Sequence, residues 1–197
     1  MRLSHKHKFV FICIPKTAST SLRKILSKYS DIRGGSVHPS HGIHYIHAKS
    51  ETLEHYFKKH KLCWDKYIKF SFCRNPWDRT VSAYSYLTTN RGTRSWRDVY
   101  LKGTSSFKDY ILNGNPYPTQ LEHINTQDPM LFVGKFENIQ ADFDIICDKI
   151  GIPREQIPHT NRTKHKHYTE HYDDETREIV AEKYARDIEY FGYEFGE

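Results

Sequence analysis

The segment from Phe9 to Leu22 constrains the fold more than any other part of the chain. Six consecutive apolar residues run from Phe9 to Ile14, a pattern typical of a parallel strand that is covered on both faces. Pro15 ends the strand, and apolar residues then recur at helical spacing from Leu22 onward. Free backbone N–H groups and the positive end of the helix dipole would point into this turn, and Lys16 adds a full charge. The turn is therefore predicted to bind a phosphate or sulfate group.

Hydroxyl side chains follow the lysine, at Thr17, Ser19, Thr20 and Ser21. They can donate hydrogen bonds to an anion, but a hydroxyl residue also caps an ordinary helix beside a solvent-facing lysine. The glycines of the Walker A motif are missing, so this is not the standard nucleoside-triphosphate loop. The segment alone leaves both interpretations open.

A second strand and helix repeat this arrangement further along the chain. Residues 66–73 read as a strand, with Ile68, Phe70 and Phe72 alternating onto one face. Arg74 then stands at the carboxyl end of that strand.

The residues after Arg74 predict the start of a helix. Asn75 suits the N-cap, Pro76 the first helical position and Asp78 the third, and Ser82 lies about two turns further on. In open α/β sheets ligands bind outside the carboxyl ends of the strands, so both turns are expected at one sheet edge. The planar guanidinium of Arg74 suits a phosphate, although pairing with a local carboxylate is a competing interpretation.

Together these segments resemble the sulfotransferases that use 3′-phosphoadenosine 5′-phosphosulfate (PAPS). The first is similar to their 5′-phosphosulfate loop, here Pro15-Lys16-Thr17-Ala18-Ser19-Thr20-Ser21, and the second to their 3′-phosphate motif, here residues 74–84. The tail resembles the carbohydrate-type branch, which includes Golgi and bacterial members, through residues 135–138, 161–164 and 184–193 together with Tyr168. Residues 86–130 match only loosely, and there we expect acceptor specificity, with Gln120 and His123 as candidates.

The resemblance implies transfer of SO3 from PAPS to an acceptor, which leaves adenosine 3′,5′-bisphosphate and needs no metal. Lys16 is then the candidate for stabilising charge on the transferring group. The implied cofactor contacts are Pro15, Lys16, Thr17, Ala18, Ser19, Thr20 and Ser21 for the 5′ side and Arg74 and Ser82 for the 3′ side, with Arg162, Thr163 and Lys164 closing from a late loop.

A hydroxyl acceptor also needs a general base, and histidine is the usual one. His38, His41, His44 and His47 lie three residues apart. A metal site is disfavoured, because Pro39 and Gly42 interrupt the helix that would align them and no acidic or cysteine ligand is near. In related sequences a histidine followed by a small residue precedes the helix before the second strand. His47-Ala48 matches that pattern, so His47 is the first candidate and His44 the second.

Length and charge are consistent with one compact domain that binds a polyanion. The 197 residues suit a single domain over 1–197, and the formal charge of +6 suits a polyanionic nucleotide. No segment is long and apolar enough to span a membrane and no signal peptide is visible, so we expect a cytoplasmic enzyme without membrane or nucleic-acid partners. The acceptor is expected to be a small molecule or carbohydrate. A P-loop kinase of a small molecule and a basic nucleic-acid-binding module remain as alternatives.

The predicted fold is α/β: a P-loop-NTPase-like three-layer sandwich with a central, mostly parallel sheet. Residues 130–134 are expected to form a third strand near the centre of the sheet. Helices are expected over 50–59, 137–150 and 174–190, and a short one near 107–112 within an otherwise irregular, acceptor-facing stretch from 90 to 118.

Overall fold

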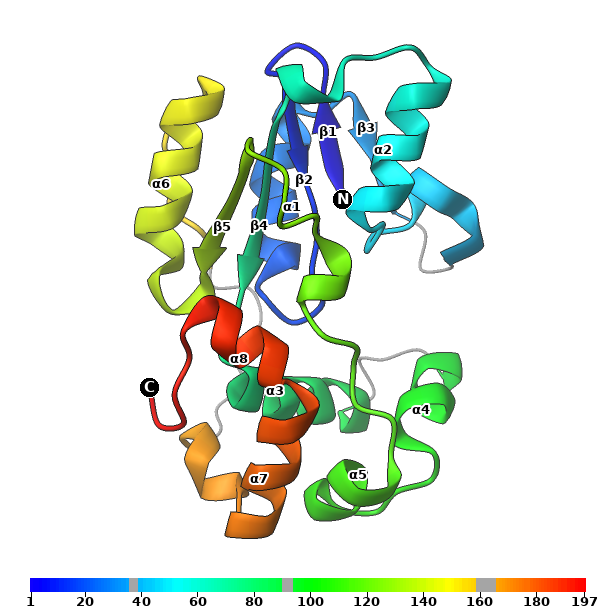
Figure 1. The fold of residues 1–197 in the computed structure, drawn as a ribbon, viewed down its shortest axis with the longest axis vertical. Helices are drawn as coiled ribbons and strands as arrows, with labels where there is room; N and C mark the ends of the chain where they lie inside the picture. The colour runs from blue at the N-terminus through cyan, green and yellow to red at the C-terminus, as the bar shows by residue number, and fades with distance from the viewer. Residues whose placement is uncertain (36–38, 90–93, 159–165) are drawn as a thin grey trace. The chain divides into compact units, whose positions relative to one another are not determined.

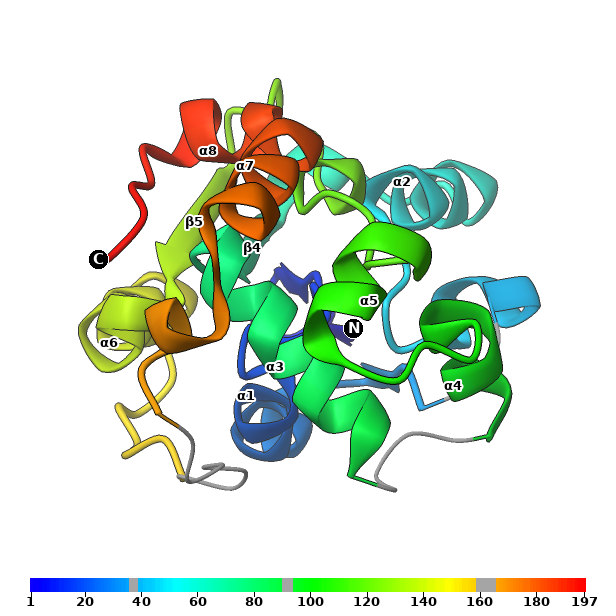
Figure 2. The same cartoon turned by 90° about the horizontal axis from the view of Figure 1, so that it is seen from below.

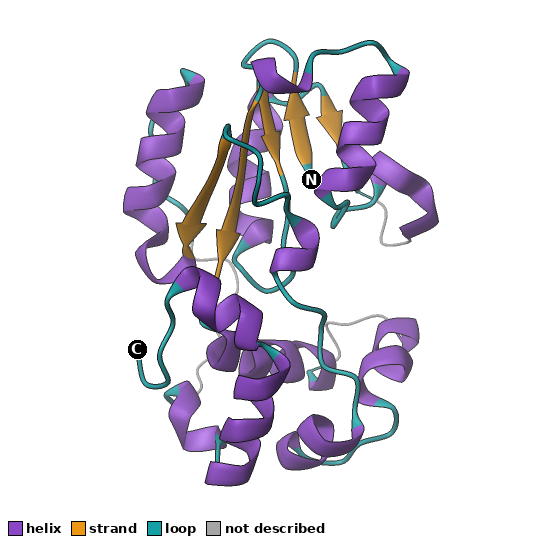
Figure 3. Ribbon diagram, in the orientation of Figure 1, coloured by secondary structure: helices purple, strands orange, loops and turns teal. Residues whose placement is uncertain are grey.

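The computed structural model of the chain describes residues 1–35, 39–89, 94–158 and 166–197. They fall into two units, described separately below. Unit 1 comprises Met1–Cys73 and Gln120–Arg162, and unit 2 comprises Arg74–Thr119 and Thr163–Glu197. The strands of the described residues all belong to unit 1, whereas the described part of unit 2 consists of helices and loops (Figure 3). Whether residues 1–197 behave as a single domain stays a prediction.

Unit 1 is built on a five-stranded sheet with the order β3-β1-β2-β4-β5 (Figure 1). Its strands are β1 (Arg2–Ser4), β2 (Phe9–Phe11), β3 (Ile32–Arg33), β4 (Ile68–Cys73) and β5 (Leu131–Lys135). The β2, β4 and β5 strands are parallel, while β1 runs antiparallel to both β2 and β3. The predicted α/β fold with a mostly parallel sheet is confirmed.

The expected central position of the strand at residues 130–134 is wrong, because β5 lies at the edge of the sheet. The centre is β2, since β1 and β3 extend the sheet on its other side. These two strands have three and two residues, too short for an alternating pattern to indicate them in the sequence.

The main core of unit 1 lies on one face of this sheet. Phe9 and Phe11 of β2 pack with Phe70 and Phe72 of β4, and the rings of Phe11 and Phe70 stack with centroids 5.1 Å apart. The helices that cover this face are α1 (Ser19–Leu26) and α6 (Ile139–Ile150), which contribute Leu22, Ile25, Leu26, Phe143, Ile146, Cys147 and Ile150. On the other face Val10 and Ile12 are also fully buried. Both faces of the sheet are thus covered, as the unbroken apolar run predicts.

One more helix and several short turns complete unit 1. The α2 helix (Ser50–Lys59) has the predicted bounds, and it buries Phe57 against the rings of Trp64 and Tyr67. The α6 helix ends as predicted at Gly151, whose φ of 67° is the left-handed conformation of a helix C-cap. Short 3₁₀ turns complete the unit: η1 (Ser27–Tyr29), η2 (Pro39–His44), η3 (Trp64–Lys66), η4 (Leu121–His123) and η5 (Phe136–Asn138).

Unit 2 gathers its helices around α3 (Pro76–Thr88), which contacts α4 (Arg94–Leu101), α5 (Phe107–Asn113) and α7 (Asp174–Lys183) (Figure 2). The α8 helix (Ala185–Phe191) follows α7, and η6 (Tyr168–His171) packs on α3. The prediction of one irregular stretch from 90 to 118 missed α4. The prediction of one helix over 174–190 is wrong, because the backbone breaks at Tyr184. We attribute the break to the packing of the Tyr184 ring, which is buried and whose hydroxyl donates to the Tyr117 main-chain oxygen at 2.6 Å.

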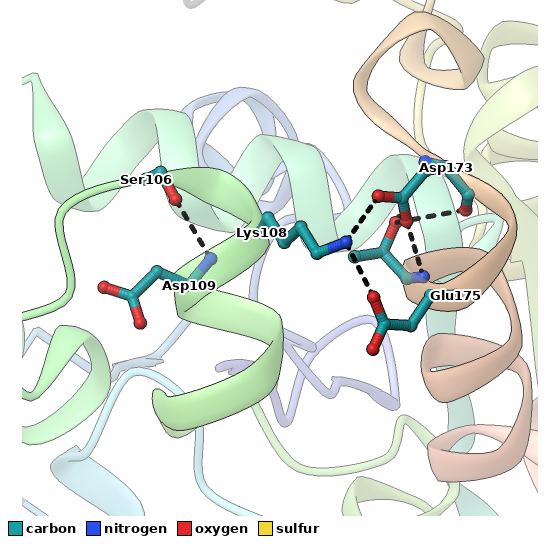
Figure 4. A network of polar contacts seen from close by, with 6 residues as sticks. Ser106, Lys108, Asp109, Asp173 and Glu175 are labelled. Atoms are coloured by element: carbon teal, nitrogen blue, oxygen red, sulfur yellow. Dashed lines mark hydrogen bonds and ion pairs between the residues drawn. The ribbon is translucent and has the colours of Figure 1, made fainter.

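An exposed ion-pair network links α5 to α7 within unit 2 (Figure 4). Lys108 Nζ lies 2.8 Å from an Asp173 carboxylate oxygen and 2.6 Å from one of Glu175. Asp173 also caps α7 by accepting the Thr176 N–H at 2.8 Å. The ammonium group of Lys108 and the bonds from Thr176 hold the pKa of the Asp173 carboxyl well below its usual range.

None of the helices in the described ranges combines the length and the hydrophobicity needed to cross a lipid bilayer.

Candidate active site

The loop between β2 and α1 adopts an unusual backbone conformation without glycine. Lys16 and Ala18 have φ values of 71° and 57°, in the left-handed region that residues with a Cβ atom rarely adopt. Such strain costs on the order of 1 kcal/mol for each residue and tends to occur at ligand-binding turns. Lys16 and Ala18 thus provide the sharp turn for which phosphate loops ordinarily use glycine.

The hydroxyl residues of this loop differ in their surroundings. Thr17 is 1% exposed, and its hydroxyl donates to the Ile14 main-chain oxygen at 3.0 Å, which fixes the loop onto the end of the strand. Ser19 and Ser21 are buried in the first turn of α1, whereas Thr20 is exposed. The first N–H groups of a helix have no intrahelical acceptor, so the start of α1 offers backbone donors and a positive dipole end to an anion.

Arg23, which no sequence motif singled out, brings a second cation to the start of α1. Its Nε atom donates to the Ser19 oxygen at 3.3 Å, and its terminal nitrogen lies 3.4 Å from the Thr20 hydroxyl oxygen. The sequence does contain a signal for this contact. Arg23 lies three residues after Thr20 and four after Ser19, and residues at these spacings are neighbours on the surface of a helix. The guanidinium is therefore held against the same helix turn that carries the hydroxyl residues.

Unit 1 brings His47 close to this loop. The His47 side chain is 8% exposed, and its Nδ1 atom lies 2.7 Å from the main-chain oxygen of Cys13, two residues before Pro15. The ring of Tyr45 packs edge-on against His47, with centroids 5.7 Å apart. The histidine is thus held at the strand end that leads into the lysine-bearing loop.

The other histidines of the series lie in different surroundings. His41 and His44 belong to η2 and are exposed, and His38 lies outside the described residues. Gly42, with φ of 53° and ψ of −125°, breaks η2, as the sequence predicts for the helix that would align them. Among the described residues, no group of three or more His, Cys, Asp or Glu side chains is arranged to hold a metal ion.

Unit 2 contains the second predicted anion motif. The Asn75 side chain accepts the Trp77 N–H at 3.1 Å, and Pro76 occupies the first turn of α3, so the predicted N-cap is confirmed. Asp78 instead forms an ion pair with Arg74, its carboxylate lying 2.7 Å from Arg74 Nε. Arg74 thus stands where strand β4 leads into α3, and it forms the local carboxylate pair that competes with phosphate binding. Its contact with a 3′-phosphate stays a prediction.

The structure describes one of the two remaining sets of predicted nucleotide contacts. Ser82 lies on α3 and is half-buried, whereas Arg162, Thr163 and Lys164 fall outside the described residues. Lys16 and His47 belong to unit 1, and Arg74 and Ser82 belong to unit 2.

The segment that carries Gln120 and His123 is fastened to the start of α2, directly after His47. Asn125 donates its N–H to the Ser50 hydroxyl and its side-chain amide to Glu54, both at 3.2 Å. Lys49 and Glu122 add an ion pair at 3.2 Å. Gln120 and His123 are both buried, and their role in acceptor recognition stays a prediction.

Comparison of the sequence with protein-family models matches the sulfotransferase family over residues 1–194. The chain therefore belongs to the sulfotransferase family, and the predicted enzyme class is confirmed. An uncharacterized protein of Archaeoglobus fulgidus is 28% identical over 96 residues, which cover 48% of this chain and 77% of that protein.

Comparison with solved structures gives two matches. The crystal structure of mouse sulfotransferase SULT7A1 complexed with PAP has a TM-score of 0.55 at 13% identity, and covers 92% of this chain and 86% of that one. A sulfotransferase from Alicyclobacillus acidocaldarius has a TM-score of 0.46 at 17% identity, with 92% of each chain covered. The mouse structure supports the predicted sulfotransferase fold.

Proposed function

We propose that this enzyme transfers a sulfuryl group from PAPS to a hydroxyl group of a carbohydrate and releases adenosine 3′,5′-bisphosphate. The observation that carries the proposal is the contact of His47 with Cys13, at 2.7 Å, beside the strained loop that bears Lys16. It supports a general base and a charge-stabilising cation at one end of strand β2. Both elements are needed for in-line transfer to a neutral hydroxyl.

The partner of His47 determines which of its nitrogen atoms can act as the base. A main-chain oxygen only accepts hydrogen bonds, so Nδ1 carries the proton and the Nε2 atom of the neutral ring keeps its lone pair. In the proposed step Nε2 takes the proton of the acceptor hydroxyl, and the hydroxyl oxygen forms a bond to sulfur. The bond from sulfur to the bridging oxygen breaks, and that electron pair leaves on the 5′-phosphate. Lys16 stabilises the charge that develops there.

For nucleotide binding we propose a division of roles between the two anion motifs. The α1 turn, with Ser19, Thr20 and Ser21, would hold the 5′-phosphosulfate, and Arg23 would add a charge to that turn. Arg74 and Ser82 would hold the 3′-phosphate, and the late loop at residues 162–164 would close over the nucleotide. The PAP found in the mouse relative is consistent with this choice of cofactor.

The carbohydrate acceptor is supported by the resemblance of the tail to the carbohydrate-type branch, and a small amine is the second candidate. We propose that the transfer needs no metal ion, because Lys16 and the α1 dipole supply positive charge that a metal would otherwise provide.

The proposal is tested by following ³⁵S transfer from labelled PAPS to a panel of neutral and acidic oligosaccharides and small amines, with EDTA present. We expect transfer to at least one oligosaccharide, together with stoichiometric release of adenosine 3′,5′-bisphosphate. Exclusive transfer to amines would contradict the acceptor class, and a requirement for added Mg²⁺ would contradict metal independence. Hydrolysis of PAPS without transfer to any acceptor would contradict the proposed reaction.

A further inference from the structure

Positive charge is concentrated in the first part of the chain. Residues 1–73 contain fourteen lysine and arginine residues but only four aspartate and glutamate residues, so their net charge of +10 exceeds the +6 of the whole protein. Most of these cations are not part of the proposed transfer site. Six lysines, here called the lysine pole, lie on two neighbouring segments of unit 1, the β1–β2 turn and the stretch from the last turn of α2 to the start of β4: Lys6, Lys8, Lys58, Lys59, Lys61 and Lys66.

These two segments meet at the edge of the sheet where β2 and β4 begin. The β1–β2 turn and the chain from α2 to β4 lie side by side there (Figure 1), and the Ile68 N–H donates to the Lys8 oxygen at 2.8 Å. Because β2 and β4 are parallel, their carboxyl ends, which lead to the Lys16 loop and Arg74, lie at the opposite edge. The lysine pole is therefore separated from the transfer site by the length of the sheet.

The lysine pole is exposed but rests on an ordered base. All six lysine side chains are exposed, and within the described ranges none of their Nζ atoms pairs with a carboxylate. Lys8 Nζ lies 3.5 Å from the Tyr67 hydroxyl and 5.0 Å from the centre of its ring. The same hydroxyl contacts His5 Nδ1 at 2.8 Å, and the Asp31 carboxylate accepts the His5 N–H. These contacts fix the turn, while Lys6 and Lys8 remain exposed.

We propose that the lysine pole binds an anionic polysaccharide chain at a site distinct from the transfer site. Ammonium groups act as point charges that suit sulfate and carboxylate groups spaced along a chain. The features that read nucleic-acid bases are weak here, because neither of the two segments carries an arginine. The choice of partner rests on the proposed function, since a sulfated carbohydrate product carries this chemistry.

The test measures binding of a heparin decasaccharide, a neutral dextran fragment and a DNA duplex of matched charge, at 50 and 200 mM salt. The first variant is Lys58→Glu/Lys59→Glu/Lys61→Glu. The matched control is Lys24→Glu/Lys102→Glu/Lys183→Glu, which makes the same change in net charge at exposed lysines elsewhere. Each protein is also titrated with adenosine 3′,5′-bisphosphate.

We expect wild type to bind heparin but not dextran, with affinity falling at the higher salt. The pole variant should lose about tenfold or more in heparin affinity, and the control about twofold at most. Adenosine 3′,5′-bisphosphate should bind all three proteins equally and should not displace heparin.

Equal losses in the two variants, tighter binding of DNA than of heparin, or displacement of heparin by the nucleotide would overturn the proposal. If none of the three proteins binds adenosine 3′,5′-bisphosphate while heparin binding still depends on the lysine pole, the proposed function is contradicted and the polysaccharide site is supported.

Discussion

The Nδ1 atom of His47 lies 2.7 Å from the main-chain oxygen of Cys13, so a histidine from the connection before α2 is held against the segment that leads from strand β2 into the Lys16 loop. This contact joins residues 34 positions apart and fixes the orientation of the imidazole ring. A base whose ring is fixed before substrate binds does not need to be ordered in the transition state, which favours proton transfer at one defined nitrogen.

Replacing His47 by asparagine should remove the proposed base while keeping a donor for the Cys13 oxygen. We expect the transfer rate to fall by about 10²- to 10⁴-fold, the usual contribution of a general base, while nucleotide affinity stays unchanged. The measurements are kcat with a saturating acceptor and titration with adenosine 3′,5′-bisphosphate. His44→Asn is the matched control, because His44 is exposed in η2, and it should keep wild-type kcat. The reverse order of effects would assign the base to His44.

Replacing Lys16 by methionine should remove the proposed charge stabilisation while keeping much of the side-chain length. We expect kcat to fall by about 10²-fold or more, as is typical when one preorganised donor to a developing charge is lost. Lys24→Met, at an exposed position on α1, makes the same chemical change away from the loop and should leave kcat unaltered. Single-turnover kinetics separates the chemical step from nucleotide binding. A Lys16→Met enzyme with normal kcat would remove the lysine from the mechanism.

The ion pair between Lys69 of β4 and Asp128 should contribute to the stability of unit 1. Lys69 Nζ lies 3.0 Å from Asp128 Oδ1, with side-chain exposures of 1% and 5%, and Trp64 Nε1 donates to Asp128 Oδ2 at 2.7 Å. Lys69→Met leaves a buried carboxylate without its cation, so we expect the free energy of unfolding to fall by about 3–5 kcal/mol.

The double variant Lys69→Met/Asp128→Asn is the control for this prediction. It removes both charges, and we expect it to recover much of the lost stability, so a double-mutant cycle from urea unfolding should give a clear coupling energy. Strictly additive losses would show that the two charges do not stabilise each other.

The Asp173 cap of α7 should make a pH-dependent contribution to the stability of unit 2. The folded-state pKa of Asp173 is depressed by Lys108 and by the bonds from Thr176, so its contribution is full above the unfolded pKa, about 3.9. It is lost as pH falls from there through the lower folded-state pKa. Asp173→Ala should therefore lower Tm at pH 7, and the difference from wild type should shrink progressively below about pH 4. The measurement is thermal unfolding at a series of pH values.

Asp98→Ala serves as the comparison for the Asp173 prediction, because it removes a carboxylate from α4 of the same unit. A Tm difference for Asp173→Ala that stays constant from pH 7 to pH 3 would mean that the carboxylate charge contributes nothing.

Local signals predicted the parts of the fold that depend on neighbouring residues. The Asn75-Pro76 helix start and the Gly151 helix end each depend on residues a few positions apart, and each is confirmed. The apolar run at 9–14 is buried throughout, as predicted, but strand β2 ends at Phe11 and not at Pro15. The strands β1 and β3 are stabilised by pairing across the sheet, so their sequences carry almost no signal. The break at Tyr184 likewise accompanies a contact with Tyr117, 67 residues earlier, which periodicity within one helix does not contain.

The features of the candidate site also differ in whether local sequence patterns could predict them. Lys16 and Arg74 follow directly from strand–turn–helix patterns, and the sequence could also place Ser82 on the second helix. The loop conformation at Lys16 and Ala18 was not predictable, because neither residue favours a positive φ. His47 could be separated from His44 only by a family pattern, whereas the structure distinguishes them by burial and by the Cys13 contact.

The most direct test of the account is calorimetric titration with adenosine 3′,5′-bisphosphate and with ADP, in EDTA, on wild type and on Arg74→Ala. Wild type should bind the bisphosphate at micromolar Kd or tighter and ADP at least about tenfold more weakly, because ADP lacks the 3′-phosphate that the guanidinium is proposed to bind. Arg74→Ala should lose this preference while retaining weak binding of both nucleotides. Equal affinity of wild type for the two nucleotides, or no binding of the bisphosphate, would contradict the account.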